Sequence, residues 1–359
     1  MRLFAFYLPQ FHEIPENNQW WGEGFTEWTN VRKAESLYRG HKQPKVPLNQ
    51  NYYNLLDKST LEWQLALQKK YGIDGLIFYH YYFKGKLLLE KPAENLLRWK
   101  DLHQSFFFCW ANHPWIRSWE GTRETIMPLE YGGETDWEEH FQYLLPFFQD
   151  ERYEKMNNMP LFCVFQSDFP EKKEMFAYLN RRSMEEGFNG ICFIESYPGY
   201  VPYLEFKSCM SEYTKKVLFR EPLIQKNNYL KSHRAIHQRG IRRIQAILRD
   251  TGLSRKPLVF DGRKLMDALI QSDEDIEEMI PAIWFEWDNT PRHKQRGYVI
   301  TPYTKDQFMT YMDKIAQKDY VFINAWNEWA EGMVLEPTEE KGYQYLEWIS
   351  EWKKRNQQN

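Results

Sequence analysis

Short, strongly apolar runs alternate with longer segments of helical character along the whole chain. The apolar runs cover residues 3–9, 75–83, 106–112, 161–166, 190–196, 280–287 and 320–326. Most are continuous apolar stretches, which is typical of parallel strands buried on both faces. Several intervening segments, such as 171–187, have helical spacing. This alternation predicts an α/β fold whose strands are joined by right-handed crossovers.

Seven strands are clear, and we expect an eighth near residues 208–220 or 257–261. No glycine-rich fingerprint follows any of these strands, which argues against a dinucleotide-binding sheet. A chain of 359 residues has the length of one large barrel. We therefore predict a (β/α)8 TIM-type barrel that forms a single catalytic domain over residues 1–359, with long loops at its C-terminal face.

Residues 11–51 form a long segment that is rich in Trp, Gly, Pro and Asn and has no clear periodicity. Loops of this length are uncommon in compact domains unless they serve a function. The loops at the C-terminal face of a barrel carry its active site. We therefore expect residues 11–51 to lie at the site.

The composition favours a carbohydrate ligand over a nucleic acid. Aromatic residues make up 17% of the chain, with 15 Trp and 23 Tyr. Such side chains suit a cleft that stacks against sugar rings, although an aromatic-rich core is the plainer alternative. The formal net charge of −3 creates no overall field that attracts nucleic acid. We expect an oligo- or polysaccharide partner and no nucleic acid.

The chain has the features of a cytoplasmic protein with one locally basic stretch. Residues 226–256 contain nine Lys or Arg against one acid, Asp250. They form either a solvated helix face or a seat for an anionic glycan, a lipid phosphate or a membrane surface. We also expect a lipid-linked glycan at the inner membrane surface as a partner. The four cysteines show no paired spacing, which indicates reduced thiols. No signal-peptide pattern precedes the first apolar run and no run has the length of a membrane span.

The predicted strands tend to end in polar or aromatic residues. Examples are Tyr79 and His80 in one strand, Asn112 and His113 after another, and Glu195 near the end of a third. In a barrel the carboxyl ends of the strands meet at one mouth, where active sites lie. We expect these side chains to gather there.

Two glutamates after the last strand, Glu328 and Glu331, are the strongest catalytic candidates. Cleavage of a glycosidic bond needs two carboxyl groups, one that assists attack and one that protonates the leaving oxygen. Their spacing also fits a pair of acids in the first turn of a helix, where the helix dipole favours negative charge. Spacing alone leaves both interpretations open.

Metal sites have weaker support. His233 and His237 have helical ligand spacing without the neighbouring glutamate of a zincin, so a basic helix face is the better interpretation. The triplet Asp273-Glu274-Asp275 resembles the acidic motif of nucleotide-sugar transferases but lies in an acidic run that looks like a helix start. We predict no metal and no cofactor.

Ordered motifs along nearly the whole chain resemble those of the WbsX-type glycosyltransferase family, also described as glycoside hydrolase family 99-like. The resemblance is carried by the stretches at residues 7–12, 20–31, 40–44, 110–112, 287–290, 324–332 and 335–337. It implies a barrel enzyme that acts on carbohydrate. Together with the strand-end pattern, it marks as substrate-binding His12, Trp21, Glu27, Trp28, His41, Tyr79, His80, Trp110, Asn112, His113, Glu195, Trp287, Asp288, Asn327, Trp329 and Glu336.

Glycoside hydrolase family 99 cleaves α-mannosidic bonds within a chain, with retention. Its motif Asn-Glu-Trp-His-Glu-Gly matches residues 327–332 except that Ala330 replaces the histidine. The resemblance implies that Glu328 removes the proton of the sugar 2-hydroxyl, which then attacks the anomeric carbon. Glu331 would protonate the leaving oxygen and later activate the acceptor. Ala330, and His113 where the family pattern has a glutamate, imply that the glycan need not be a mannoside.

Three functions follow as expectations. The first is a retaining enzyme that makes or breaks glycosidic bonds of a surface polysaccharide by the two-glutamate route. The second is a nucleotide-sugar-dependent glycosyltransferase of O-antigen or capsule biosynthesis, as the family name implies. The third is a non-catalytic glycan-binding barrel.

Overall fold

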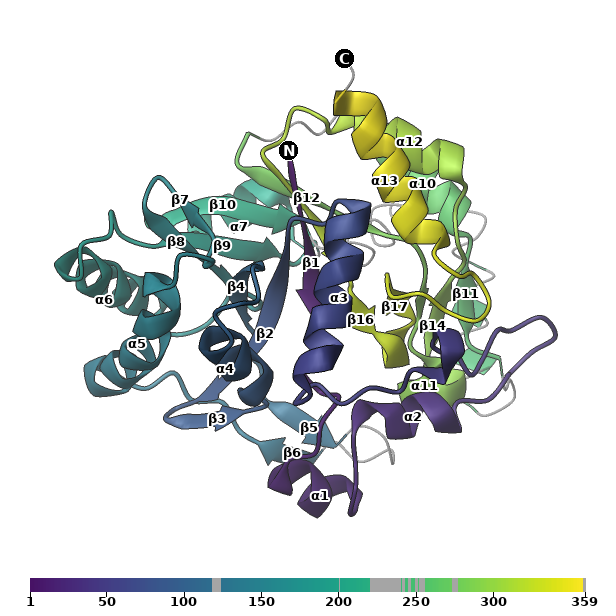
Figure 1. The fold of residues 1–359 in the computed structure, drawn as a ribbon, viewed down its shortest axis with the longest axis horizontal. Helices are drawn as coiled ribbons and strands as arrows, with labels where there is room; N and C mark the ends of the chain where they lie inside the picture. The colour runs from purple at the N-terminus through teal and green to yellow at the C-terminus, as the bar shows by residue number, and fades with distance from the viewer. Residues whose placement is uncertain are drawn as a thin grey trace.

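The computed structural model describes residues 1–117, 124–199, 201–219, 256–272 and 277–357, with isolated positions at 240, 243–244, 247–248 and 251 (Figure 1). Eight parallel strands pair in chain order, and the last pairs with the first. The predicted (β/α)8 barrel is confirmed. Its strands are β1 (Arg2–Tyr7), β2 (Gly75–Phe83), β4 (Ser105–Trp110), β8 (Met159–Val164), β9 (Cys192–Tyr197), β10 (Thr214–Phe219), β12 (Met279–Trp284) and β15 (Tyr320–Asn324).

All seven clear strand predictions overlap a barrel strand, and β10 supplies the eighth within the first of the two expected ranges. The second range holds β11 (Leu258–Phe260), which pairs with β14 (Tyr298–Ile300) outside the barrel. The predicted strand 280–287 ends early, at Trp284. A separate short strand, β13 (Trp287–Asp288), follows it and pairs with β14.

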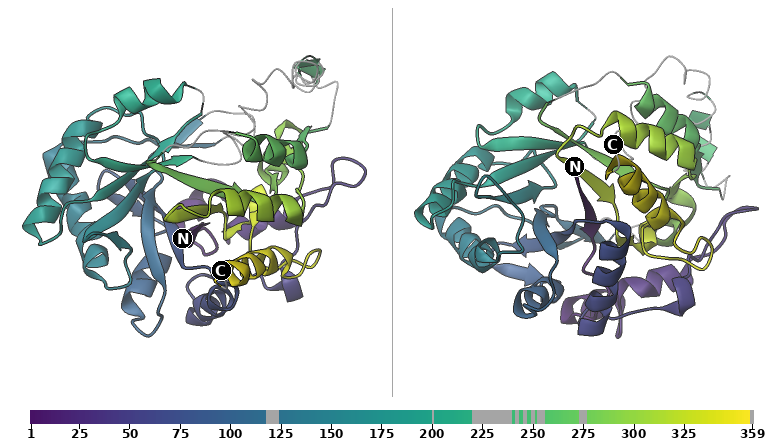
Figure 2. Two further views of the ribbon diagram at one scale, coloured as in Figure 1. Left: turned by 90° about the horizontal axis from the view of Figure 1, so that it is seen from above. Right: turned by 45° about the horizontal axis from the view of Figure 1, so that its top comes forward.

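Helices join successive strands and cover the outside of the barrel (Figure 2). The helix expected at 171–187 is α6, which is slightly shorter than predicted. The chain begins at the amino end of β1, and both termini lie toward that end of the barrel in Figure 1. The main helices are α3 (Lys58–Tyr71), α4 (Lys91–Arg98), α5 (Glu134–Gln149), α6 (Lys172–Glu185), α7 (Tyr203–Cys209), α10 (Gly262–Ile270), α12 (Lys305–Lys314) and α13 (Gln344–Gln357).

Aromatic rings fill the barrel interior. The ring of Phe107 lies 5.2 Å from that of Phe4 and 5.5 Å from that of Phe322, so three strands meet at the barrel axis. Gly75 faces Phe4 across the β1–β2 pairing, and a Cβ at this position would lie 2.1 Å from the Phe4 ring. Glycine is therefore required here for close packing rather than for an unusual backbone angle.

The long segment after β1 is more regular than its sequence indicates. It contains α1 (Pro15–Trp21), α2 (Glu27–Lys33) and a short 3₁₀ turn at Leu48–Gln50. Trp28 of α2 packs against Trp329, with ring centroids 5.5 Å apart. The segment thus covers the C-terminal face of the barrel beside the predicted glutamate pair.

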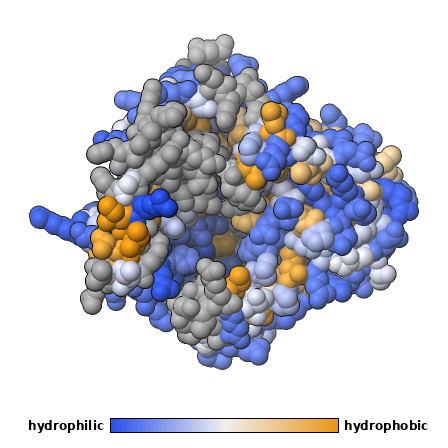
Figure 3. Space-filling model, turned by 180° about the vertical axis from the view of Figure 1, so that it is seen from behind, coloured by the Kyte–Doolittle hydropathy of each residue, from blue (hydrophilic) through white to orange (hydrophobic). Residues whose placement is uncertain are grey.

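Several of the features singled out in the sequence lie outside the described residues. His233, His237, the triplet at 273–275 and most of the basic stretch 226–256 are among the residues that the structure does not describe. Cys109, Cys163 and Cys192 are buried free thiols, whereas Cys209 is exposed. Among the described residues, none of the helices has the length and apolar character needed to cross a membrane. The face in Figure 3 is largely hydrophilic and is hollowed near its centre.

Candidate active site

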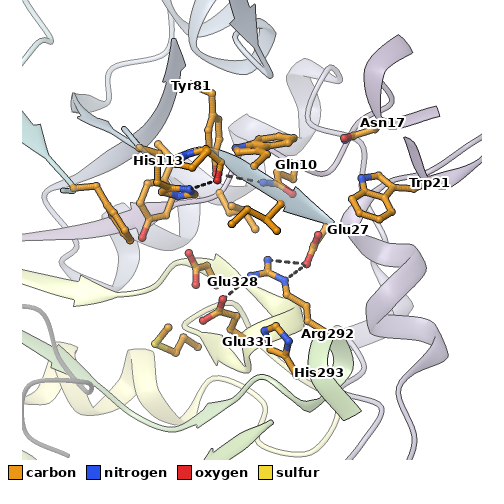
Figure 4. Close-up of a pocket in the computed structure, with 18 of the residues that line it drawn as sticks. Gln10, Asn17, Trp21, Glu27, Tyr81, His113, Arg292, His293, Glu328 and Glu331 are labelled. Atoms are coloured by element: carbon orange, nitrogen blue, oxygen red, sulfur yellow. Dashed lines mark hydrogen bonds and ion pairs between the residues drawn. The ribbon is translucent and has the colours of Figure 1, made fainter. Parts of the chain in front are cut away.

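A cavity of about 310 Å³ opens at the carboxyl ends of the barrel strands (Figure 4). Residues that follow or end β1, β2, β4, β8, β12 and β15 line it, as do residues of α1, α2 and α11 (Thr290–His293). Its walls are strongly aromatic. The principal lining side chains are Gln10, Asn17, Trp21, Phe25, Glu27, Tyr79, Tyr81, His113, Trp115, Phe165, Trp287, Arg292, His293, Asn324, Glu328 and Glu331.

A tight hairpin presents the two glutamates to this cavity. Strand β16 (Asn327–Glu328) pairs antiparallel with β17 (Met333–Val334), and the 3₁₀ turn η4 (Trp329–Glu331) joins them. Glu328 ends β16 and precedes the turn, whereas Glu331 is the last residue of η4. Both line the cavity. The interpretation of the pair as the first turn of an α-helix is therefore wrong.

Gly332 closes the hairpin. Its φ of 64° is left-handed, and a Cβ there would lie 3.0 Å from Lys45 Cε and 3.1 Å from the Asp288 amide nitrogen. Both the backbone angle and the limited space favour glycine. The turn therefore packs closely against Lys45 and against the backbone of Asp288 in β13.

Asn327 attaches the hairpin to the end of β1. Its Oδ1 accepts a hydrogen bond from the Leu8 amide at 2.7 Å, and its Nδ2 donates to the Leu8 carbonyl at 3.1 Å. The side chain thus replaces the ladder partner that Leu8 would have in a longer strand. This pairing fixes the backbone immediately before Glu328.

A buried carboxylate, Glu336, supports the hairpin from behind. It accepts hydrogen bonds from Tyr53, Gln64, Trp326 and Trp329, at donor–acceptor distances between 2.7 and 2.9 Å. Burial raises the pKa of Glu336 to about 7, even though these four donors act to lower it. Glu336 therefore positions the tryptophans that flank Asn327 and Glu328.

Arg292 links two of the acids that line the cavity. Its Nε and Nη2 donate to Glu27 Oε1 at 2.9 and 2.8 Å, while its Nη1 donates to Glu331 Oε1 at 2.5 Å (Figure 4). Trp287 Nε1 donates to the other oxygen of Glu331 at 3.0 Å. Burial alone would lower the pKa of Arg292, but Glu27, Glu331 and Glu328 raise it above its ordinary value. The guanidinium therefore stays charged and orients Glu331.

Asp288 organises the loop that carries Arg292. The Leu37 amide donates to His41 Nδ1, so His41 Nε2 carries the proton and donates to Asp288 at 2.8 Å. The Thr290 hydroxyl donates to the other Asp288 oxygen at 2.6 Å. Burial alone would raise the pKa of Asp288, but hydrogen bonds from His41, Thr290 and Gln43 lower it below its ordinary value.

The residues predicted from the sequence divide into two layers. Those that line the cavity are Trp21, Glu27, Tyr79, His113, Trp287, Glu328 and Glu331. The others are buried and are not among the residues that line it: His12, Trp28, His41, His80, Trp110, Asn112, Glu195, Asp288, Asn327, Trp329 and Glu336.

Several members of the buried group have internal partners. His80 Nε2 lies 2.9 Å from His140 Nε2, and burial lowers the pKa of His80 to about 3. Asn112 exchanges two hydrogen bonds with the Gln166 backbone, at 2.7 and 2.8 Å. Glu195 binds Lys172 at 2.8 Å. These contacts support a structural role for these side chains.

The sequence reasoning missed Tyr81 and Arg292. Along β2 the side chains alternate between two faces, so Tyr79 and Tyr81 line the cavity while His80 faces outward. Period-two alternation was available from the sequence and would have replaced His80 by Tyr81. Arg292 lies four residues beyond Asp288, just outside the stretch 287–290 that the sequence singled out.

Ala330 does not have the place that the family resemblance implied for it. Its side chain is completely buried and lies outside the residues that line the cavity. The loss of a histidine there therefore changes the packing beneath η4 before it changes any contact with a glycan. His113, the other departure, does line the cavity.

Comparison with known proteins identifies the family. The model of the family described as "Glycosyltransferase WbsX" matches residues 3–349. The chain belongs to the WbsX glycosyltransferase family. Two proteins of Xanthomonas campestris pv. campestris, from strains B100 and ATCC 33913, are each 29% identical to it over 364 residues. Both are called "Uncharacterized protein WxcX"; the match covers 96% of this chain and 48% of their length, so the chain spans about half of these relatives.

Solved structures share the barrel. A "Glycoside hydrolase-like protein" superposes with a TM-score of 0.58 at 14% identity, covering 98% of this chain and 93% of its own. The GH99 endo-alpha-mannosidase from Bacteroides thetaiotaomicron gives a TM-score of 0.56 at 12% identity, covering 99% and 98%. Identities this low establish the fold alone. The family to which the chain belongs is described as a glycosyltransferase family.

Proposed function

We propose that this chain makes or breaks glycosidic bonds of a surface polysaccharide with retention of anomeric configuration, using Glu328 and Glu331. The observation that carries the proposal is the 3₁₀ hairpin, which turns both carboxyl groups into one aromatic-walled cavity. A pair of carboxyl groups beside the scissile bond is the equipment that glycoside chemistry needs. Flat aromatic walls suit the apolar faces of sugar rings.

In the proposed reaction, Glu328 takes the proton of the substrate 2-hydroxyl while that oxygen attacks the anomeric carbon. The bond to the leaving oxygen breaks, and Glu331 gives that oxygen a proton. An acceptor, either water or a sugar hydroxyl, then passes its proton to Glu331 and attacks the anomeric carbon, and the 2-oxygen recovers its proton from Glu328. Each proton transfer contributes about 10²–10⁴-fold to the rate. Two inversions at one carbon give net retention.

Arg292 would serve this reaction by fixing Glu331. Two of its nitrogens are held by Glu27, which leaves Nη1 for Glu331. With Trp287 on the other oxygen, the carboxyl group has one defined orientation toward the cavity.

A nucleotide-sugar-dependent transferase is the second candidate function, favoured by the description of the family as glycosyltransferases. The charges that line the cavity argue for the first candidate. Three carboxyl groups, Glu27, Glu328 and Glu331, surround a single arginine, Arg292, which is a poor environment for a diphosphate.

The setting that we propose is glycan assembly at the cytoplasmic side of a membrane, in one catalytic domain. The basic composition of residues 226–256 supports contact with a lipid-linked glycan at the inner membrane surface. The net charge of −3 gives no support for a nucleic-acid partner.

Glu331→Gln tests the assignment. The variant should keep its fold and its glycan binding but lose turnover by about 10²-fold or more, because the amide cannot transfer a proton. Turnover is measured by chromatography of oligosaccharide products, and the anomer first formed is identified by NMR. Glu351→Gln, on the exposed face of α13, is the matched control and should remain active.

Four outcomes would redirect the proposal. Unchanged turnover in Glu331→Gln, or an inverted first product, rejects the two-glutamate route. Product formation that depends on an added nucleotide sugar selects the transferase. Glycan binding by the unmodified protein without any product selects a non-catalytic binding barrel.

A further inference from the structure

A second and larger cavity lies beside the candidate active site. It has a volume of about 800 Å³ and is lined by the segments that follow β8 and β9, the start of α6 and residues of α7. Phe165 lines both cavities. We propose that this second cavity binds the continuation of the glycan chain whose reacting sugar occupies the first, an inference that rests on the proposed function.

The size of the first cavity makes an extension necessary for a polymeric substrate. At about 310 Å³ it lies at the lower limit of ordinary ligand pockets, which span roughly 300–1,000 Å³. It can enclose the reacting sugar but only a short part of an oligosaccharide. The neighbouring cavity provides the remaining room on the same face of the barrel.

The lining of the second cavity suits sugar rings. Tyr197, Val201 and Phe206 supply apolar surface, and Tyr197 is held by a hydrogen bond from its hydroxyl to the Val201 carbonyl at 2.6 Å. Ser196 is nearly completely buried, and its hydroxyl has no hydrogen-bond partner within the described part of the chain. Apolar surface with a few polar groups is the pattern by which proteins bind small neutral ligands.

The charge of the second cavity excludes a phosphate-rich occupant. Its lining carries four carboxyl groups, those of Asp168, Glu171, Glu174 and Glu205, against Lys172 and Lys173. Lys172 already donates to Glu195, Ser167 and Cys209, at distances of 2.7–3.0 Å. The remaining field is negative and repels a nucleoside diphosphate. A neutral oligosaccharide meets no such penalty.

Phe165 is a residue that lines both cavities. It follows β8 directly, and its ring lies 5.2 Å from the ring of His113 and 6.2 Å from that of Tyr79, both of which line the first cavity. A sugar that stacks on Phe165 can therefore extend in either direction. The chain would pass over this ring from the reacting sugar into the second cavity.

Cys209 offers a direct test, because it lines the second cavity and is the one exposed cysteine of the four. The probes are fragments of one to six sugars from the surface polysaccharide of the organism that encodes this chain. They are added to Glu331→Gln protein, in which turnover does not shorten them. The rate of alkylation of Cys209 by iodoacetamide is followed by mass spectrometry, with the buried cysteines as internal controls.

Fragments of four to six sugars should slow alkylation about tenfold when present at about ten times their Kd, whereas a monosaccharide should leave it unchanged. A matched variant, Phe165→Ala, should weaken this protection. If every fragment leaves the Cys209 rate unchanged, or if uridine diphosphate alone protects it, the second site is rejected.

The two proposals fail separately. Protection of Cys209 reports only occupancy of the second cavity, whereas the effect of Glu331→Gln on turnover reports only the reaction. Length-dependent protection with unchanged turnover in Glu331→Gln would retain the second site and reject the two-glutamate route. Loss of turnover in Glu331→Gln without protection of Cys209 would retain the two-glutamate route and reject the second site.

Discussion

At the candidate active site, the sequence predicted two of the acidic residues but not Arg292, which links them. The sequence identified Glu27 and Glu331 as functional candidates, and the structure joins them through one guanidinium. Their 304-residue separation along the chain hides that link, since an ion pair leaves no local pattern. Tyr81, by contrast, was predictable from the two-residue period of β2. Sequence therefore predicts strand-end candidates better than it predicts the charged partners that orient them.

Replacement of Arg292 by methionine should destabilise the fold as well as disorient Glu331. Glu27 is only 1% exposed and would lose its charged partner. Removal of one member of a buried pair costs about 3–5 kcal/mol. Urea unfolding should show this decrease, and the double variant Arg292→Met/Glu27→Gln should recover more than half of it. Equal stability of Arg292→Met and the unmodified protein would contradict a buried pair.

At the scale of elements, the barrel strands were predictable and the catalytic hairpin was not. Continuous apolar runs such as 320–326 have few interpretations other than a buried strand. Residues 327–334 instead form two short strands around a 3₁₀ turn. Their geometry depends on a distant contact with Leu8 and on Glu336, which the distant residues Tyr53 and Gln64 hold in place. Local propensity contains no record of such contacts. The spacing of the glutamates was visible, but the turn that aligns them was not.

Glu336 should make stability depend on pH through this hairpin. Its pKa is raised in the folded protein from 4.5 to about 7, so the folded state binds a proton that the unfolded state has released. The contribution of Glu336 to stability is therefore fully present below about pH 4.5 and is lost as pH rises through 7, a change of about 3 kcal/mol for this group. Thermal unfolding between pH 5 and 8 measures the slope.

Glu336→Gln provides the comparison. The amide does not titrate in this range, so the part of the slope due to Glu336 should disappear. Because the amide nitrogen would face hydrogen-bond donors, the variant should also be less stable at pH 5 than the unmodified protein. A pH slope that is identical in both proteins would show that Glu336 remains ionised throughout.

The whole molecule depends on closure of the barrel around its aromatic interior. Gly75 lies where β1, β2 and β4 meet, opposite Phe4 and Ser105 in the two pairings. A Cβ there would lie 2.1 Å from the Phe4 ring and 2.6 Å from the Ser105 carbonyl oxygen. Neither neighbour can easily move away from an added methyl group. The Phe4 ring is confined by the packed core, and the Ser105 carbonyl is part of a barrel strand.

Gly75→Ala should therefore lower the free energy of unfolding by about 3 kcal/mol or more, at or above the upper end of the usual cost of overpacking. Gly133→Ala is the matched control, because nothing lies within 4 Å of its added methyl group and its φ of −135° suits alanine. Chemical denaturation compares the two. Equal stability of both variants would show that the barrel interior can yield at Gly75.

Both chain ends lie toward the amino end of the barrel, away from the mouth that carries the glutamate pair (Figures 1 and 2). An affinity tag, a bead or a fused reporter attached at either end would therefore lie on the side of the barrel opposite the cavity. Immobilised protein would still offer its open face to long polymers in solution. Capture on a surface followed by washing with labelled polysaccharide thus becomes a practical assay for this chain.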